Sequence, residues 1–121
     1  MYDNIMDDRM RELIETGVMK SLVKTLLSAG FFVTVNNGGD EDELQDSNDE
    51  AEILRAMRLT DEDHLLVSKT KGKRDHFVYL VYGNDGLDLI CDYSFGIEDI
   101  IKPTLDLAEK LEECFSILSK I

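Results

Sequence analysis

Two short apolar runs on either side of a turn-forming tetrad constrain the fold of this chain more than any other feature. Residues 76–82 read His-Phe-Val-Tyr-Leu-Val-Tyr and residues 87–93 read Leu-Asp-Leu-Ile-Cys-Asp-Tyr, with Gly-Asn-Asp-Gly between them. Aromatic and β-branched runs around such a tetrad predict a β-hairpin. Because side chains alternate along a strand, one face of the hairpin should form the core. That face carries Val78, Leu80, Tyr82, Leu87, Leu89 and Cys91.

The other face of the hairpin is mixed, since it places Phe77, Tyr79, Val81 and Ile90 beside Asp88 and Asp92. A further strand over residues 64–69 would complete an antiparallel meander with strands 76–82 and 87–93. Residues 31–35 predict one more strand, and an acidic return strand within 40–45 would lie at a sheet edge, where charge deters further pairing. The sheet should therefore have three to five strands.

Helices are expected before, between and after these strands in the sequence. They cover residues 3–29, a short segment from a capping box at 47–50 to about residue 59, and residues 103–119, where Pro103 is tolerable near the start. The predicted fold class is α+β, with the antiparallel sheet packed by the N-terminal and C-terminal helices. At 121 residues the chain fits a single domain, 1–121. We expect Leu80, Leu89, Leu107, Leu111 and Phe115 to be buried.

The first helix changes its apolar face at Gly17, so either it bends there or two helices meet. Residues such as Met10 and Leu13 would then form a separate stripe, which suggests a homodimer through residues 5–14. Alternatively, the helix simply wraps around the core. Cys91 and Cys114 are too few for a disulfide framework and are expected to be buried thiols.

Charge excludes several functions. The chain has 26 acidic residues against 13 Lys and Arg, a formal charge of −13. Such a chain should repel nucleic acid and anionic membranes, while its 43% apolar content is typical of a folded protein. No signal peptide is recognisable, and no apolar run approaches the roughly 18 residues that span a bilayer. We therefore expect a cytoplasmic protein.

The acids are concentrated in one region, and they are the candidate partner-binding residues. A calcium loop starting at Asp40 or Asp46 lacks the required glycine and the final glutamate, so no metal or other cofactor is expected. The acids either form a solvated surface or imitate nucleic-acid phosphates for a basic protein partner. The one basic cluster, residues 69–74, could pair with this acidic region. The candidate acids are Asp40, Glu41, Asp42, Glu43, Asp46, Asp61, Glu62 and Asp63.

Enzymatic chemistry has little support in the sequence. His64 and His76 lie near strand ends without a nucleophile elbow, and no HExxH or CxxC pair or phosphate-binding glycine loop is present. We therefore expect no enzyme. The alternative is a small metal-dependent hydrolase that uses both histidines and nearby aspartates, among them Asp88, Asp92 and Asp99.

The segments 26–33, 60–63 and 82–93 resemble small uncharacterised acidic proteins of phages and mobile elements, over about residues 20–110. The resemblance implies a genomic setting and assigns no functional residue. Together with the charge, it suggests an inhibitor that mimics DNA and blocks a host defence nuclease or other nucleic-acid-binding protein, in an anti-restriction or anti-CRISPR role. The alternative binding function is an immunity or antitoxin-like protein that neutralises a basic toxin.

Overall fold

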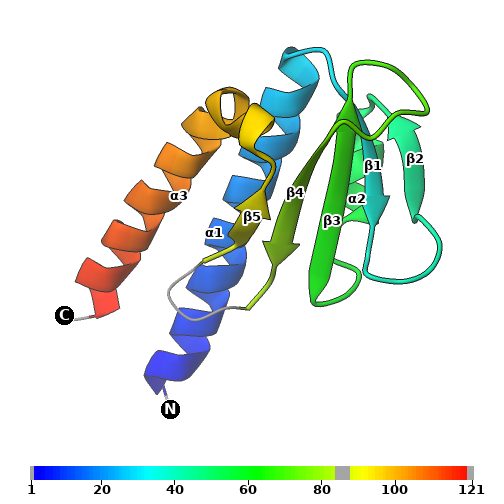
Figure 1. Cartoon of the computed structure of the whole chain (residues 1–121). Coiled ribbons are helices and arrows are strands. Elements are labelled where there is room, and N and C mark those ends of the chain that lie inside the picture. The colour runs from blue at the N-terminus through cyan, green and yellow to red at the C-terminus, as the bar shows by residue number, and fades with distance from the viewer. Residues whose placement is uncertain (1, 84–87, 120–121) are drawn as a thin grey trace.

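The computed structural model describes residues 2–83 and 88–119, with side chains at 8–83, 88–114 and 117. Figure 1 shows an antiparallel sheet with helices gathered on one side. The elements follow the order α1 (Tyr2–Ser28), β1 (Phe32–Asn36), β2 (Leu44–Ser47), α2 (Glu50–Ala56), β3 (Glu62–Ser68), β4 (His76–Val81), β5 (Ile90–Tyr93), a 3-10 turn η2 (Phe95–Ile97) and α3 (Glu98–Ser119). The predicted α+β class is confirmed.

The sheet has five strands in the order β2-β1-β3-β4-β5, and every neighbouring pair is antiparallel. The predicted meander is therefore confirmed as β3, β4 and β5, and the strand expected at 31–35 joins it as β1. The acidic return strand is also present, shifted to Leu44–Ser47, and it lies at the edge as expected.

The core lies between the sheet and the helices. Alternation along the strands turns Val33, Val35, Leu65, Val67 and Leu80 inward, where all are fully buried. From α1 and α2 the core receives, among others, Leu22, Val23, Leu26 and Ile53. Burying this apolar surface supplies the main driving force for folding.

The C-terminal helix lies alongside α1 in antiparallel fashion (Figure 1) and makes most of its close contacts with that helix, while Ile101 contributes to the core. At this contact Ser21 Oγ and Thr104 Oγ1 share a hydrogen bond of 2.8 Å. Leu107 and Leu111 are consequently only half-buried, against our expectation, while Leu80 and Leu89 are buried as expected. The Phe115 side chain lies outside the described residues.

A β-bulge explains the main error in the predicted hairpin register. Val78 pairs with Tyr93 and Tyr79 with Asp92, but Leu80 pairs with Ile90, so β5 holds one extra residue at this point. Cys91 is therefore exposed instead of buried. The expected core position Leu87 lies outside the described residues.

Four further predictions need correction. Helix α1 runs without interruption across Gly17, which excludes the alternative of two separate helices. Helix α3 begins at Glu98, so Pro103 sits inside it, and Cys114 on α3 is exposed rather than buried. Ser47 does not cap α2. Its hydroxyl accepts a bond from the Asp49 amide (3.1 Å), and Asp49 is the cap, with its carboxylate accepting from the Glu52 amide (3.0 Å). The hydroxyl thus shapes the turn that precedes the helix.

No described helix lies over the second face of the sheet (Figure 1). Leu66, Phe77 and Val81 project from this open face and are half-buried outside the core cluster. The loop that connects β3 to β4 bends across this face of the sheet near β1. There the Lys71 ammonium lies 5.2 Å from the centre of the Phe32 ring. We call this surface of the sheet the open face.

Replacing Gly17 by alanine should stabilise the protein. Position 17 lies inside a continuous helix, and a Cβ atom there would meet no neighbour within 4 Å. Since alanine exceeds glycine in helix propensity by about 1 kcal/mol, we expect Gly17→Ala to raise the free energy of unfolding by about 0.5–1 kcal/mol in urea denaturation. A loss of stability would show that α1 requires a break at this position.

Candidate interaction surface

The two acidic segments of the sequence meet at one end of the sheet. The β1–β2 loop and the α2–β3 loop are joined by hydrogen bonds from Thr60 Oγ1 to the Asn37 carbonyl (2.8 Å) and from Asn37 Nδ2 to the Ala56 carbonyl (3.1 Å). The Glu62 side chain packs against Gly38, whose positive φ of 97° suits glycine and where a Cβ would lie 2.5 Å from Glu62 Oε1. The fold therefore brings together acids that lie about twenty residues apart in sequence.

Asp63 is not part of this surface, although we predicted it as a partner-binding residue. It is fully buried, with 0% exposure, and its carboxylate accepts hydrogen bonds from Asn37 Nδ2 (2.6 Å), the Arg58 amide (2.7 Å) and the Tyr82 hydroxyl. Burial raises the pKa of Asp63, because an apolar environment disfavours the charged form, and these donors oppose that effect. The carboxylate holds loops together instead of facing a partner.

Three other predicted residues also have internal contacts. Asp42 accepts from Asn36 Nδ2 (3.1 Å) and forms an ion pair with Arg74, and these contacts hold the pKa of Asp42 below its ordinary value. The suggested pairing of the basic cluster with the acidic region is thereby confirmed at Arg74. Asp46 is half-buried in β2 with a φ of 47°, and its amide donates to Thr34 Oγ1 (3.0 Å). Glu62 accepts a hydrogen bond from the Tyr79 hydroxyl (2.5 Å).

The remaining predicted acids are fully available. Asp40, Glu41, Glu43 and Asp61 are exposed on the two joined loops. Within the part of the chain that the structure describes, none of these four carboxylates forms an ion pair. We call these four residues the acidic rim. No described cation of the chain pairs with these carboxylates, so their negative charge is available to attract a basic surface.

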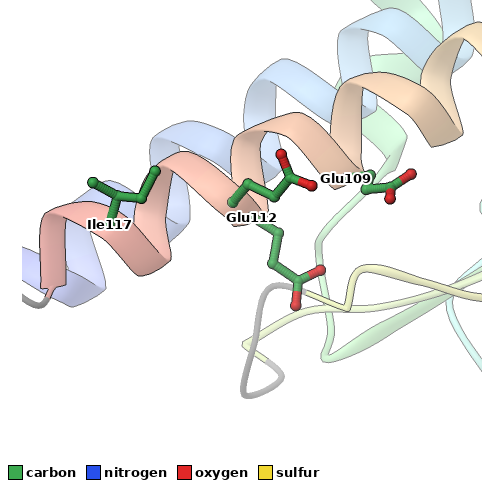
Figure 2. Close-up of a pocket in the computed structure, with 4 residues that line it drawn as sticks. Glu109, Glu112 and Ile117 are labelled. Carbon is green, nitrogen blue, oxygen red and sulfur yellow. The ribbon is translucent and has the colours of Figure 1, made fainter.

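A second group of acids lies along α3. Figure 2 shows Glu109, Glu112 and Ile117 around a shallow hollow on the C-terminal half of this helix, which Glu113 also lines. Ile117 is 63% exposed there. These glutamates come from one helix face, whereas the acidic rim is assembled from two loops. The α3 acids therefore offer a comparison surface of similar charge and different geometry.

The structure places the two histidines of the hydrolase alternative on opposite faces of the sheet. His64 and Tyr79 pair across β3 and β4 on the open face, whereas His76 pairs with Val67 on the core face. The His76 ring lies at the end of the sheet, 6.1 Å from the centre of the Phe31 ring. Among the described residues, no three His, Cys, Asp or Glu side chains are placed to hold a metal ion together. Asp92 pairs with Tyr79, while Asp88 and Asp99 are exposed elsewhere.

Sequence reasoning overlooked the donors that surround Asp63. Asn37 was expected in a turn and Arg58 at the end of the short helix, while Tyr82 was expected on the core face of its strand. One signal was available: Asp63 is in phase with Leu65 and Val67 in the alternating pattern of its strand, which indicates an inward direction. The cluster of neighbouring acids concealed this signal.

Comparison of the chain with protein-family models, curated proteins and solved structures finds no match. Function is therefore inferred from the residues and their arrangement. Across the described part of the chain, no helix combines the length and apolar character needed to cross a membrane.

Burial of Asp63 predicts a specific pH dependence of stability. Its folded-state pKa is raised above 3.8, so the folded chain holds this proton more tightly than the unfolded chain. The resulting stabilisation is present in full below the unfolded pKa and is lost as pH rises through the folded pKa. The free energy of unfolding should therefore gain a contribution from Asp63 as pH falls through its raised folded-state pKa towards 3.8, beyond the general relief of charge repulsion.

Asp63→Asn provides the control, because it removes the titrating group and keeps similar volume. Denaturant unfolding at several pH values should give a shallower pH slope for this variant than for the wild type, whatever its absolute stability. Equal slopes would mean that Asp63 titrates in the folded chain as it does in the unfolded one.

Proposed function

We propose that this chain is a non-enzymatic acidic protein of phage or mobile-element origin that inhibits a basic, nucleic-acid-binding protein of the host, such as a defence nuclease. The observation that carries the proposal is the acidic rim, in which four exposed carboxylates on two joined loops lack ion pairs within the described residues. Duplex DNA carries about one charge per 1.7 Å of its axis, so a protein surface dense in carboxylates can compete for the same Lys/Arg cleft.

The network around Asp63 supports this proposal because it fixes the positions of the rim loops. Asn37 contacts both Asp63 and the end of α2, and Thr60 contacts Asn37. Carboxylates on a pre-ordered surface lose less conformational entropy on binding than those on a flexible chain. An immunity or antitoxin-like protein would use the same charge against a basic toxin; such a partner would be encoded beside this chain rather than by the host.

Neutralising the acidic rim should slow association with the partner. The variant Asp40→Asn, Glu41→Gln, Glu43→Gln and Asp61→Asn leaves out Asp42 and Asp63, because both have internal roles. Electrostatic steering raises association rates far above those of neutral pairs, so we expect about a ten-fold or larger loss in association rate at low salt. The effect should shrink as the Debye length falls from about 10 Å at 0.1 M to about 3 Å at 1 M.

The experiment begins with capture from host lysate and elution at high salt, followed by rate measurements on the isolated partner and competition with labelled duplex DNA. The matched control neutralises Asp106, Glu109, Glu112 and Glu113 on α3, which removes an equal charge. Equal losses from both variants would mean that net charge alone acts. An absence of loss from both would contradict the inhibitor proposal. Each surface change should alter stability by no more than about 0.5 kcal/mol.

We also propose that the predicted self-association uses Leu13, which is 72% exposed on α1. Arg9, Glu12 and Thr16 surround it, whereas Ile14 packs against the core. Light scattering after size exclusion should give a dimer for the full chain and a monomer for Leu13→Ser. Deleting the segment is a poorer test, because Arg58 bonds to Thr16 and to the Glu12 carbonyl. A monomeric wild-type chain would exclude a dimer through residues 5–14.

A further inference from the structure

The open face carries a row of polar and aromatic side chains beside the acidic rim. Antiparallel pairing places His64, Tyr79 and Asp92 next to one another on β3, β4 and β5. The His64 and Tyr79 rings stack, with their centres 4.5 Å apart and their planes 30° from parallel. Glu62 accepts the Tyr79 hydroxyl at 2.5 Å, and its Oε2 lies 3.7 Å from His64 Nε2. A flat aromatic surface thus lies beside two carboxylates.

The Tyr79 ring, which is half-buried, is stacked by His64 on one of its two sides. His64 stacks on the side towards β3, so the other side is directed towards β5, where the exposed Asp92 is the cross-strand neighbour. Phe77 and Val81 flank Tyr79 on the same face of β4, since they lie two residues away in either direction. The position therefore combines an aromatic surface, a carboxylate and apolar borders.

Lys and Arg side chains of this protein already lie over other aromatic rings. The Lys69 ammonium lies 5.5 Å from the centre of the Phe31 ring, Lys71 lies over Phe32, and the Arg58 guanidinium carbon lies 5.9 Å from the centre of the Tyr82 ring. Among the described residues, no cation lies over Tyr79 or Phe77. The part of the open face formed by β4 and β5 thus carries an aromatic ring beside Asp92, whose Oδ1 accepts the Tyr93 amide (2.9 Å) and which forms no ion pair among the described residues.

We propose that Tyr79, together with Asp92 and Glu62, receives an arginine side chain of the basic partner. A guanidinium is planar, so it can stack on Tyr79 while its N–H groups pair with a carboxylate, whereas a lysine ammonium is a compact and more strongly hydrated charge. The inference rests on the proposed function and specifies its contact: the acidic rim attracts the basic partner, and this arginine site selects one of its side chains. Glu62 connects the two, because it packs against Gly38 and also bonds to Tyr79.

The test measures binding of fluorescent oligo-arginine and oligo-lysine peptides of equal length to the full chain at low salt. The readout is the ratio of their two affinities. Since an exposed cation–π contact is worth about 0.5–1 kcal/mol, we expect Tyr79→Ala to lower the preference for arginine by about two- to five-fold. Asp92→Asn should lower it as well, without truncating a ring. Tyr79→Phe keeps the ring and should keep most of the preference.

Asp106→Asn is the matched control for Asp92→Asn, because it removes the same charge from an exposed position on α3. It should leave the ratio unchanged. The arginine site is refuted if neither Tyr79→Ala nor Asp92→Asn changes the ratio in variants shown to be folded by circular dichroism. The neutralised rim variant separates the two proposals: it should weaken both peptides equally and preserve the ratio. If it binds both peptides like the wild type while Tyr79→Ala changes the ratio, the rim proposal fails and the arginine site stands.

Discussion

The buried carboxylate of Asp63 joins three separate parts of this structure. Asp63 lies on β3. Its carboxylate accepts hydrogen bonds from Asn37 in the β1–β2 loop, from the Arg58 amide just after α2, and from the Tyr82 hydroxyl at the end of β4. Removing a carboxylate from water costs several kcal/mol unless donors replace the lost hydration. Three donors do so here, and the raised pKa of Asp63 shows that burial still outweighs them. The exposed acids of the rim are carried by loops that this internal acid holds in place.

Arg58 extends the same network to the first helix. Its φ of 58° lies in the left-handed region, where glycine is usual after a helix. A glycine would relax the backbone but would lose a guanidinium that bonds to Thr16 Oγ1 (2.9 Å) and approaches the Glu12 carbonyl (3.4 Å). Glu15, which is nearly buried, accepts the Gly83 amide at 2.8 Å and adds a second link between α1 and the sheet. Polar contacts thus join α1, α2 and the strands at the acidic end of the molecule.

Much of the fold could be predicted from alternation and turn chemistry, because both act over a few residues. The strands at 31–35, 64–69 and 76–82 were found to within about two residues, which is the usual uncertainty at element ends. The bulge in β5 was not predictable, since one inserted residue leaves the apolar pattern almost unchanged. Its effect is that the Cys91 side chain is exposed instead of facing the core. The packing of α3 on α1 was also beyond the sequence, because an apolar stripe shows that a helix needs a partner and does not say which one.

The candidate site, like the fold, could be predicted only in part from the sequence. Exposure of Asp40, Glu41, Glu43 and Asp61 follows from their position in turns, which sequence can indicate. The distinct roles of Asp42 and Asp63 depend on Arg74, Asn37 and Tyr82, residues distant in sequence that only the folded chain brings near. The same long-range placement decides which aromatic rings receive a cation. Lys71 and Arg74 come from one connection and attach to the β1 side of the open face, at Phe32 and Asp42. On the β4–β5 side, no Lys or Arg of the described residues lies over Tyr79.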